Sequence, residues 1–292
     1  MPKPGETIST RGISHASGGK GANQAGAWGK LKANTVFLWQ VGKDEIGDMV
    51  LSELNEHNVD TSKAKILHNE ATGQAYILSM PNGENSIIIH GGANTAWESD
   101  MESLDPEFVE TIKASKILLL QRELPEHVNT LAAKVAKEAN VTVILDAGGH
   151  DIPITDSLLS SIDIFSPNET ELERIMESDF DSNLSPIENG KTLIEKYSNL
   201  KLLLKLGENG SVYISDSKVI EVPAVSDHKG NKIIDTTGAG DWFTGAFATK
   251  LAEGKSLKES MEYANVAGFL CITKFGALPS LPTKDEVDEF LK

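Results

Sequence analysis

Asp241 lies in a stretch whose residue types and spacing suit phosphoryl transfer. Gly238, Ala239 and Gly240 precede it, and a run of small and aromatic residues follows to about Glu253. Glycines let a backbone turn tightly and approach a ligand closely. The first amides of a helix lack internal partners and carry the positive end of the helix dipole, so this turn predicts an anion site. A carboxylate there suits a general base that takes a proton from a hydroxyl attacking a phosphate.

A purely structural interpretation is also open, in which Asp241 only caps the helix, as aspartate often does. The apolar pair Ile233–Ile234 before the turn predicts a strand, so the expected order is strand, turn and helix.

Two known nucleotide-binding sequence motifs are excluded. The Gly-Lys-Ser at 254–256 and the Gly-Lys-Thr at 190–192 lack the glycine that a P-loop has five positions earlier. The turn also carries Phe243 where a dinucleotide fingerprint has its third glycine.

A second glycine-rich turn, at 18–21, leads into a predicted helix of small residues. Small residues at a helix start allow a small ligand to approach the backbone closely. Lys20 and Asn23 offer hydrogen-bond donors suited to sugar hydroxyls. The alternative is a tight turn before a closely packed helix, with no ligand.

These two stretches resemble the two sequence signatures of the ribokinase-like sugar kinases, the PfkB family. The resemblance covers nearly the whole chain and is nearest to the ribokinases of that family, especially those of plant type. It implies ATP-dependent phosphorylation of a sugar's primary hydroxyl, above all D-ribose to D-ribose 5-phosphate, with Asp241 as catalytic base and residues 238–241 as anion hole. A fructokinase or nucleoside kinase of the same family is one alternative, and a non-catalytic nucleotide- or sugar-binding regulator is another.

The resemblance also assigns ligand-binding residues by position. The sugar would contact Gly19, Lys20, Gly21, Ala22, Asn23, Glu123 and Asp241. For Glu123 the alternative is an ordinary surface carboxylate after a strand. The nucleotide would contact Asn168, Glu171, Lys205, Leu206, Gly207, Glu208, Asn209, Gly210, Gly240, Asp241 and, at the adenine, Asn265. Lys205 replaces a commoner threonine, so the resemblance predicts a role for its backbone and leaves that of its side chain open. For Asn265 the alternative is a polar residue on a helix face.

Two cation sites are expected. Asn168 and Glu171 are three positions apart at a predicted helix start, so they share a face and can hold Mg²⁺ through water. A capping box is the structural alternative, while Asn-x-x-Glu is the Mg-phosphate motif of the family. The resemblance further implies a monovalent cation, K⁺, bound by the side chains of Asp235 and Ser280 and by the carbonyls of Thr237, Cys271, Lys274 and Gly276.

The order of the predicted elements indicates an α/β fold. From Lys116 onward, strands near 117–120, 141–145, 162–165 and 202–204 alternate with helices, and each strand ends in a polar or glycine-rich turn. This predicts a mostly parallel sheet covered by helices on both faces, with ligands at the carboxyl ends of the strands. The resemblance implies a single domain over 1–292 with the ribokinase-like three-layer sandwich. We also expect a buried strand over 35–39 and a helix capped by Asp44.

A predicted hairpin interrupts this alternation. Gln74–Ser79 and residues 86–89 are strand-like, with a turn at 81–85 between them. The resemblance implies that residues 1–17 and 70–95 form a small β lid over the sugar, and that two lids pair to make a homodimer. Residues 1–17 themselves are consistent with a short exposed strand or with a loop.

Composition excludes several classes of partner. The 27 basic and 43 acidic residues give a net charge of −16, which argues against nucleic acid and anionic membranes because both need a basic surface. No apolar run reaches membrane-spanning length, and we find no secretory signal. The single cysteine fits a reducing compartment, so we expect a cytoplasmic protein, with an organellar leader before Met1 also compatible.

This sequence departs from the family's pattern at the N-terminus. Members usually begin with a buried strand that ends in a short Asn/Asp segment holding the sugar. Residues 1–6 align with what normally follows that strand, which is therefore expected to be absent. Its loss would expose neighbouring backbone groups. An incomplete gene model, a trimmed chain or a genuine short form with impaired sugar binding would each account for this, and we expect the first.

Overall fold

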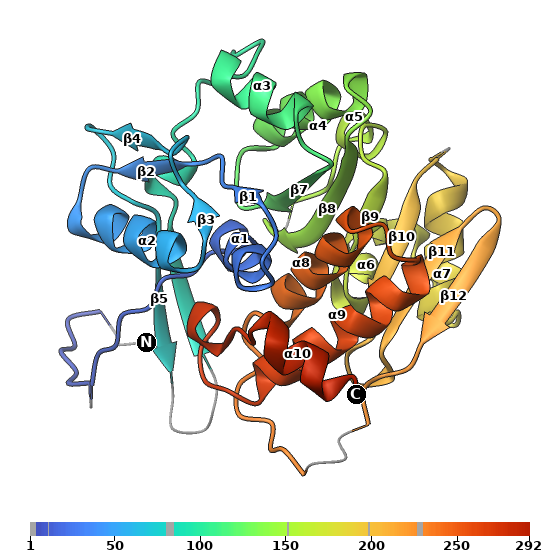
Figure 1. Cartoon of the computed structure of the whole chain (residues 1–292). Coiled ribbons are helices and arrows are strands. Elements are labelled where there is room, and N and C mark those ends of the chain that lie inside the picture. The colour runs from blue at the N-terminus through green and yellow to red at the C-terminus, as the bar shows by residue number, and fades with distance from the viewer. Residues whose placement is uncertain (1–3, 11, 80–84, 151, 198, 227–229) are drawn as a thin grey trace.

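A six-stranded sheet forms the centre of the molecule in the computed structural model, which describes residues 4–292 except 11, 80–84, 151, 198 and 227–229 (Figure 1). The strands follow one another in the order β12-β11-β10-β9-β8-β7. Their bounds are Ile117–Arg122 (β7), Thr142–Gly149 (β8), Ile164–Ser166 (β9), Lys201–Lys205 (β10), Ser211–Ser215 (β11) and Lys218–Val222 (β12).

The sheet is mostly parallel, as predicted. β7, β8, β9 and β10 pair in parallel, while β11 and β12 add an antiparallel edge that the sequence analysis did not anticipate. On the other side, β8 is the only described strand paired with β7. β8 is longer than expected, because residues 146–149 continue the strand instead of forming a turn. It therefore carries Asp146 inside the sheet.

Helices cover both faces of the sheet and give it three layers. Along β8, Ile144 belongs to one apolar cluster, while Val143 and Leu145 belong to the other. This alternation follows from the two-residue period of a strand, and burial on both faces is typical of parallel sheets. One cluster includes α1 (Lys20–Lys30), α8 (Ala239–Ala252), α9 (Leu257–Ile272) and α10 (Lys284–Phe290). The other includes α3 (Pro106–Lys113), α4 (Glu126–Glu138), α5 (Asp156–Leu159), α6 (Glu169–Met176) and α7 (Pro186–Glu195).

Short strand pairs lie beside this sandwich. β1 (Thr35–Val36) pairs in parallel with β3 (Val59–Asp60), and β2 (Gln40–Gly42) pairs in parallel with β4 (Lys65–Leu67). The expected strand over 35–39 is thus wrong for its last three residues. Here the chain passes from β3 to β4 as its neighbour: the Phe37 amide donates to the Asp60 carbonyl at 3.0 Å, and the Lys65 amide donates to the Trp39 carbonyl at 2.9 Å. The rings of Phe37 and Trp39 stack with centroids 4.4 Å apart.

Asp44 caps α2 (Glu45–Glu56) as predicted. Its Oδ1 accepts hydrogen bonds from the Gly47 amide at 2.8 Å and from the Thr72 hydroxyl at 2.6 Å. Its Oδ2 accepts the Thr72 amide at 2.8 Å. One carboxylate therefore ties the start of α2 to the segment that leads into the hairpin.

The predicted hairpin is present. β5 (Gln74–Ser79) pairs antiparallel with β6 (Asn85–His90), and Tyr76 faces Ile88 across the ladder. The expected turn at 81–85 lies almost wholly outside the described residues. The large apolar side chains on this hairpin are exposed: Tyr76, Ile77, Leu78, Ile87, Ile88 and Ile89.

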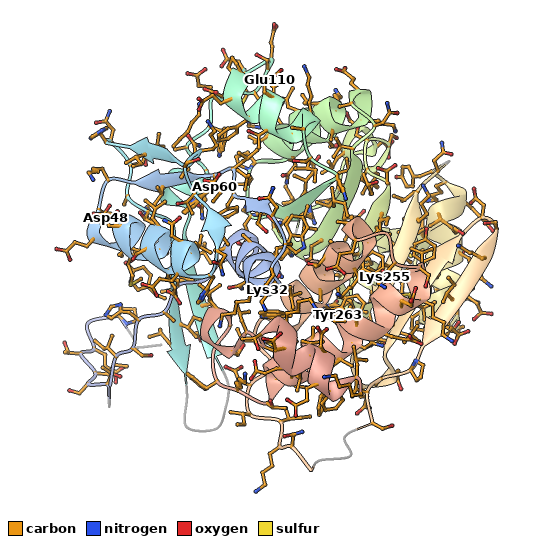
Figure 2. All side chains as sticks on the ribbon, viewed as in Figure 1. Lys32, Asp48, Asp60, Glu110, Lys255 and Tyr263 are labelled. Atoms are coloured by element: carbon orange, nitrogen blue, oxygen red, sulfur yellow. The ribbon has the colours of Figure 1, made fainter. Side chains whose placement is uncertain are left out.

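The loop segments complete the chain. Residues 5–10 and 12–19 contain no strand. Ile233 and Ile234 are not in a strand either, so the predicted strand before the glycine turn at 238–240 is wrong. Both isoleucines are more than half exposed, because they run over the surface as a loop. The Ile234 amide donates to the Ile272 carbonyl at 2.8 Å. Exposed charged side chains, among them Lys32, Asp48 and Glu110, cover the outer surface (Figure 2). No helix in the described part of the chain is both long and apolar enough to cross a lipid bilayer.

Candidate active site

The turn before α8 positions Asp241 at a helix N-terminus. Gly238 is the residue before the helix and has φ 79°, a left-handed conformation that favours glycine. A Cβ at Gly238 would also lie 3.1 Å from the Cβ of Ala277. Asp241 is in the first turn of α8 and only 4% exposed. The predicted arrangement of glycine turn, helix start and carboxylate is therefore present.

Helix α1 brings three donors to the Asp241 carboxylate. Asn23 Nδ2 donates to Oδ2 at 2.9 Å, Gln24 Nε2 donates to Oδ1 at 3.2 Å, and Lys20 Nζ donates to Oδ1 at 3.4 Å. The two helices approach closely because of small residues: a Cβ on Gly245 would lie 2.9 Å from Ala27 Cβ. The two glycine-rich stretches of the sequence thus form one site.

Glu123 contacts the same helix start. Its Oε2 accepts the backbone amide of Lys20 at 2.7 Å, and Gly19 turns at φ 88° just before it. Burial raises the pKa of the Glu123 carboxyl, and the hydrogen bond from Lys20 only partly opposes this. Glu123 is therefore a partly buried carboxylate that contacts the start of α1, and its contact with a sugar stays a prediction.

Burial and charge set the protonation of the central pair. Burial raises the pKa of Asp241, although the neighbouring Lys20 ammonium acts in the opposite direction. For Lys20, burial alone would lower the pKa, but the carboxylates of Asp241 and Asp146 outweigh it and raise the pKa. A carboxylate with a raised pKa is a stronger base than an exposed aspartate, and Lys20 stays cationic beside it.

Sequence reasoning missed a second buried carboxylate, Asp146. It is fully buried, and its Oδ2 accepts Lys205 Nζ at 2.9 Å and the Thr244 hydroxyl at 2.8 Å. The Gly148 amide donates to its Oδ1 at 3.0 Å. An aspartate at the end of an otherwise apolar buried strand was the signal available in the sequence.

Gln24 and Gln121 form a further link that the sequence did not reveal. Gln121 Nε2 donates to Gln24 Oε1 at 2.6 Å, which leaves the Gln24 amide free to donate to Asp241. Because a glutamine side chain has one accepting and one donating end, β7 orients the donor that reaches the carboxylate.

The predicted nucleotide loop follows β10. Gly207 and Gly210 have φ 51° and 91°, and the Leu206 amide bonds the Gly210 carbonyl at 2.8 Å, so the loop is a tight turn around residues 207–209. The loop lies next to the α8 turn, since a Cβ on Gly240 would be 3.6 Å from Lys205 Nζ. Asn265 Nδ2 donates to the Pro223 carbonyl at 3.0 Å, which fits the structural interpretation of that residue.

Comparison with known proteins identifies the family. The model described as "pfkB family carbohydrate kinase" matches residues 2–284. This chain belongs to the pfkB family of carbohydrate kinases. The protein named Ribokinase from Arabidopsis thaliana is 41% identical over 299 residues, which span 100% of this chain and 76% of that protein. The ribokinase of Haemophilus influenzae is 36% identical and matches 99% of this chain and 92% of its own length.

Solved structures of ribokinases are also similar to this chain. The "Structure of Arabidopsis thaliana Ribokinase complexed with Ribose and ATP" matches with a TM-score of 0.92 and 39% identity, over 100% of this chain and 93% of that one. A ribokinase from Thermotoga maritima matches with a TM-score of 0.86 and 30% identity, over 99% and 92%. The ribokinase-like fold of this pfkB family member is therefore established.

Within this pfkB kinase, Asn168 and Glu171 form the capping box that we named as the structural alternative. Asn168 Oδ1 accepts the Glu171 amide, and Glu171 Oε2 accepts the Asn168 amide, each at 2.8 Å. The second oxygen, Glu171 Oε1, faces Gly148, where a Cβ would approach it to 3.0 Å. The box therefore fits a Mg²⁺ ion held through water, since one carboxylate oxygen is not used by the cap.

The residues predicted to hold a monovalent cation lie on the loop before α8 and on the last turn of α9 with the segment that follows it. Asp235 accepts the Thr237 amide at 2.9 Å and the Gly276 amide at 3.0 Å, so its carboxylate joins both segments. The Cys271 thiol lies 3.8 Å from the Thr237 carbonyl and 3.0 Å from the Ser280 hydroxyl. The donor set of carbonyls, a hydroxyl and one carboxylate fits a hard cation such as K⁺.

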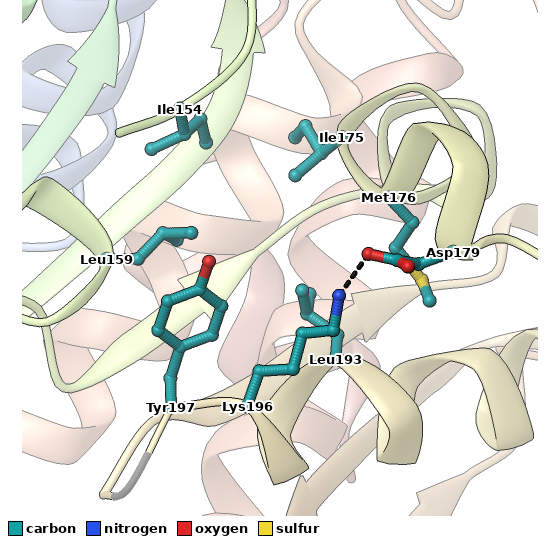
Figure 3. A pocket seen from close by; sticks show the side chains of 8 residues that line it. All are labelled: Ile154, Leu159, Ile175, Met176, Asp179, Leu193, Lys196 and Tyr197. Atoms are coloured by element: carbon teal, nitrogen blue, oxygen red, sulfur yellow. Dashed lines mark hydrogen bonds and ion pairs between the residues drawn. The ribbon is translucent and has the colours of Figure 1, made fainter. Parts of the chain in front are cut away.

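A separate hollow, shown in Figure 3, is lined by residues of the apolar cluster that does not include α8. Its lining includes Leu159, Met176 and Leu193, which belong to the cluster of α3–α7. Lys196 pairs with Asp179 at its rim. None of its lining residues was predicted for the site, and we assign it no ligand.

Proposed function

We propose that this chain is an ATP-dependent ribokinase that converts D-ribose to D-ribose 5-phosphate. The observation that carries the proposal is the Asp241 carboxylate, placed at the N-terminus of α8 and contacted by Asn23 and Lys20. The named ribokinases among its relatives, and the solved relative complexed with ribose and ATP, support this choice of substrates.

In the proposed reaction Asp241 accepts the proton of the sugar's primary hydroxyl as that oxygen attacks the terminal phosphate. The helix start at residues 238–241 stabilises the charge of the phosphoryl group in the transition state. The Lys20 ammonium, 3.4 Å from Asp241 Oδ1, favours the ionised form of Asp241 against the effect of burial, which raises its pKa. Glu123 and Asn23 orient the sugar, and the 205–210 loop holds the nucleotide. Mg²⁺, held through Asn168 and Glu171, would neutralise phosphate charge.

A K⁺ ion bound between the 235–237 and 271–280 loops would order the anion hole. Asp235 and Gly238 are three residues apart, so a cation on Asp235 acts directly on the glycine turn. The single cysteine, which is buried, fits a reducing compartment such as the cytoplasm.

The hairpin β5–β6 is proposed as the lid and as a dimer interface. A two-stranded ribbon is marginally stable alone, and this one exposes apolar side chains on both faces, including Ile77 and Ile88. Pairing with the hairpin of a second copy would bury them. Two copies in one assembly would thus cover two sugar sites.

Measuring ATP consumption by the purified chain tests the proposed reaction. Ribose with Mg²⁺ should support turnover, fructose and nucleosides should support much less, and K⁺ should raise the rate. The Asp241→Asn variant is the control for a contaminating kinase. Equal turnover with fructose or a nucleoside would reject the ribose assignment, and ATP binding without turnover on any sugar would favour a regulator.

A further inference from the structure

Lys205 is held unusually firmly for a lysine. Its amide donates to the Pro167 carbonyl at 2.9 Å, and its backbone bridges to Asn168, the N-cap of α6. Its Nζ donates to Asp146 Oδ2 at 2.9 Å and lies 4.0 Å from Glu171 Oε2. The side chain is only 11% exposed. A long, flexible side chain is thus fixed at both its base and its tip.

The tip of Lys205 faces the proposed phosphoryl site. Gly240 lies directly before the base, and a Cβ there would be 3.6 Å from Lys205 Nζ. On the other side of Asp146, Lys20 Nζ lies 3.9 Å from Oδ1 and 3.4 Å from Asp241. One fully buried carboxylate therefore has an ammonium group on each of its oxygens, both beside the positive end of α8.

This arrangement leaves donors available for an anion. An ammonium has three N–H groups, and the hydrogen bond to Asp146 uses one of those on Lys205. Asp146 also accepts from Thr244 and Gly148, so its oxygens have partners besides the lysine. A buried ion pair seldom stabilises a fold more than well-packed apolar residues do, so stability alone does not account for the pair.

We propose that the Lys205 ammonium binds the phosphoryl group that is transferred, and that Asp146 is the positioning residue that holds this ammonium beside the N-terminus of α8. The proposal rests on the kinase function proposed above and gives the Lys205 side chain a role that the family resemblance left open. A compact ammonium suits phosphate as a point charge. It would bind ATP more than ADP, because only ATP carries the group to be transferred.

The test compares binding of Mg-ATP and Mg-ADP by calorimetric titration. Lys205→Met should weaken ATP binding roughly tenfold to a hundredfold, the factor expected for one charge-assisted hydrogen bond, and ADP binding less than threefold. Lys205→Arg keeps the charge and should recover part of the ATP preference. Lys196→Met, which removes another lysine paired with an aspartate but lies in the separate hollow, should leave both affinities unchanged.

Asp146 is tested by its coupling to Lys205. Asp146→Asn should reduce the ATP preference, and adding it to Lys205→Met should reduce that preference no further, because Asp146 acts through the lysine. A purely structural Asp146 would instead lower the melting temperature and leave the ratio of ATP to ADP affinity unchanged.

The outcomes separate this inference from the proposed function. ATP binding by a folded Lys205→Met variant within twofold of the unsubstituted protein overturns the role of Lys205. Additive losses in the double variant overturn the role of Asp146. If the unsubstituted protein prefers ATP through Lys205 but phosphorylates no sugar, the proposed function fails, while the binding of the terminal phosphate of ATP by Lys205 stands. Absence of binding to either nucleotide overturns both.

Discussion

Asn23 Nδ2 lies 2.9 Å from Asp241 Oδ2, although the two residues are 218 positions apart. The first belongs to the proposed sugar-binding helix start, and the second is the proposed base. Their direct contact means that the base and a sugar-orienting group share one hydrogen-bond network. A sugar hydroxyl that enters this network meets the proton acceptor and the orienting donor together.

Replacing Asp241 with asparagine should lower kcat by roughly 10²- to 10⁴-fold, because the amide cannot accept the hydroxyl proton. Initial-rate kinetics with ribose and ATP measure this, and thermal unfolding checks that the variant is folded. A folded variant with nearly unchanged kcat would show that Asp241 only caps α8.

The pH dependence of kcat/KM should shift when Lys20 is replaced by methionine. The Lys20 ammonium lowers the pKa of Asp241, which burial raises. Without that charge the pKa of Asp241 rises further. As the pH is lowered, Asp241 is then protonated, and the base is lost, at a higher pH than in the parent protein. The acid limb should therefore move to higher pH. Lys30→Met, a change on the same helix that leaves the Asp241 contacts intact, should not move the limb. An unmoved limb in Lys20→Met would contradict the coupling.

Asp44→Ala should destabilise the fold by about 1–3 kcal/mol, through loss of the cap on α2 and of the partner of the buried Thr72 side chain. The hydrogen bonds from Thr72 lower the pKa of Asp44 in the folded state. Its contribution is thus present above the unfolded-state pKa and is lost as the pH falls through the folded-state pKa.

Urea unfolding at neutral and acidic pH measures this effect. The difference in unfolding free energy between the parent protein and Asp44→Ala should shrink in acid. Asp44→Asn, which keeps a capping oxygen, should lose less than the alanine variant at neutral pH. A difference that does not depend on pH would contradict the role of the ionised carboxylate.

Ile89→Glu on the hairpin should convert a dimer to a monomer, because Ile89 is 76% exposed and the proposed interface would bury it. Light scattering after size-exclusion chromatography gives the molar mass. Val219→Glu, at an exposed apolar position on β12, is the matched control and should leave the mass unchanged. A parent protein that is already monomeric would reject the lid interface.

Activation by K⁺ should disappear in Asp235→Ala, which removes the carboxylate that joins the 237 and 276 loops. Rates measured over a range of KCl, with ionic strength held constant by a tetraalkylammonium salt, test this. Asp216→Ala, an exposed aspartate elsewhere, should retain the K⁺ response. An equal K⁺ response in Asp235→Ala would place the cation elsewhere.

Local sequence determined the features that depend on local physics. The glycine turns at 18–21 and 238–240, the Asp44 cap and the alternation of strands and helices were all predictable, because backbone freedom, capping and hydrophobic period act over a few residues. The same reasoning failed for Ile233–Ile234 and for residues 37–39. There an apolar run predicts a strand, but residues 233–234 lie in a surface loop, and at 37–39 the chain passes from pairing with β3 to pairing with β4, which interrupts the strand.

Only the tertiary structure decided which of these elements meet. Asp146 was unremarkable in the sequence until β8 proved to run through it and β10 brought Lys205 to its side. The link from Gln121 through Gln24 to Asp241 likewise joins three separate elements. Such contacts depend on the register of the sheet and the approach of α1 to α8, which are set by packing over the whole chain. The sequence can therefore predict which residue is a candidate base, but only the tertiary structure shows which charged groups surround it.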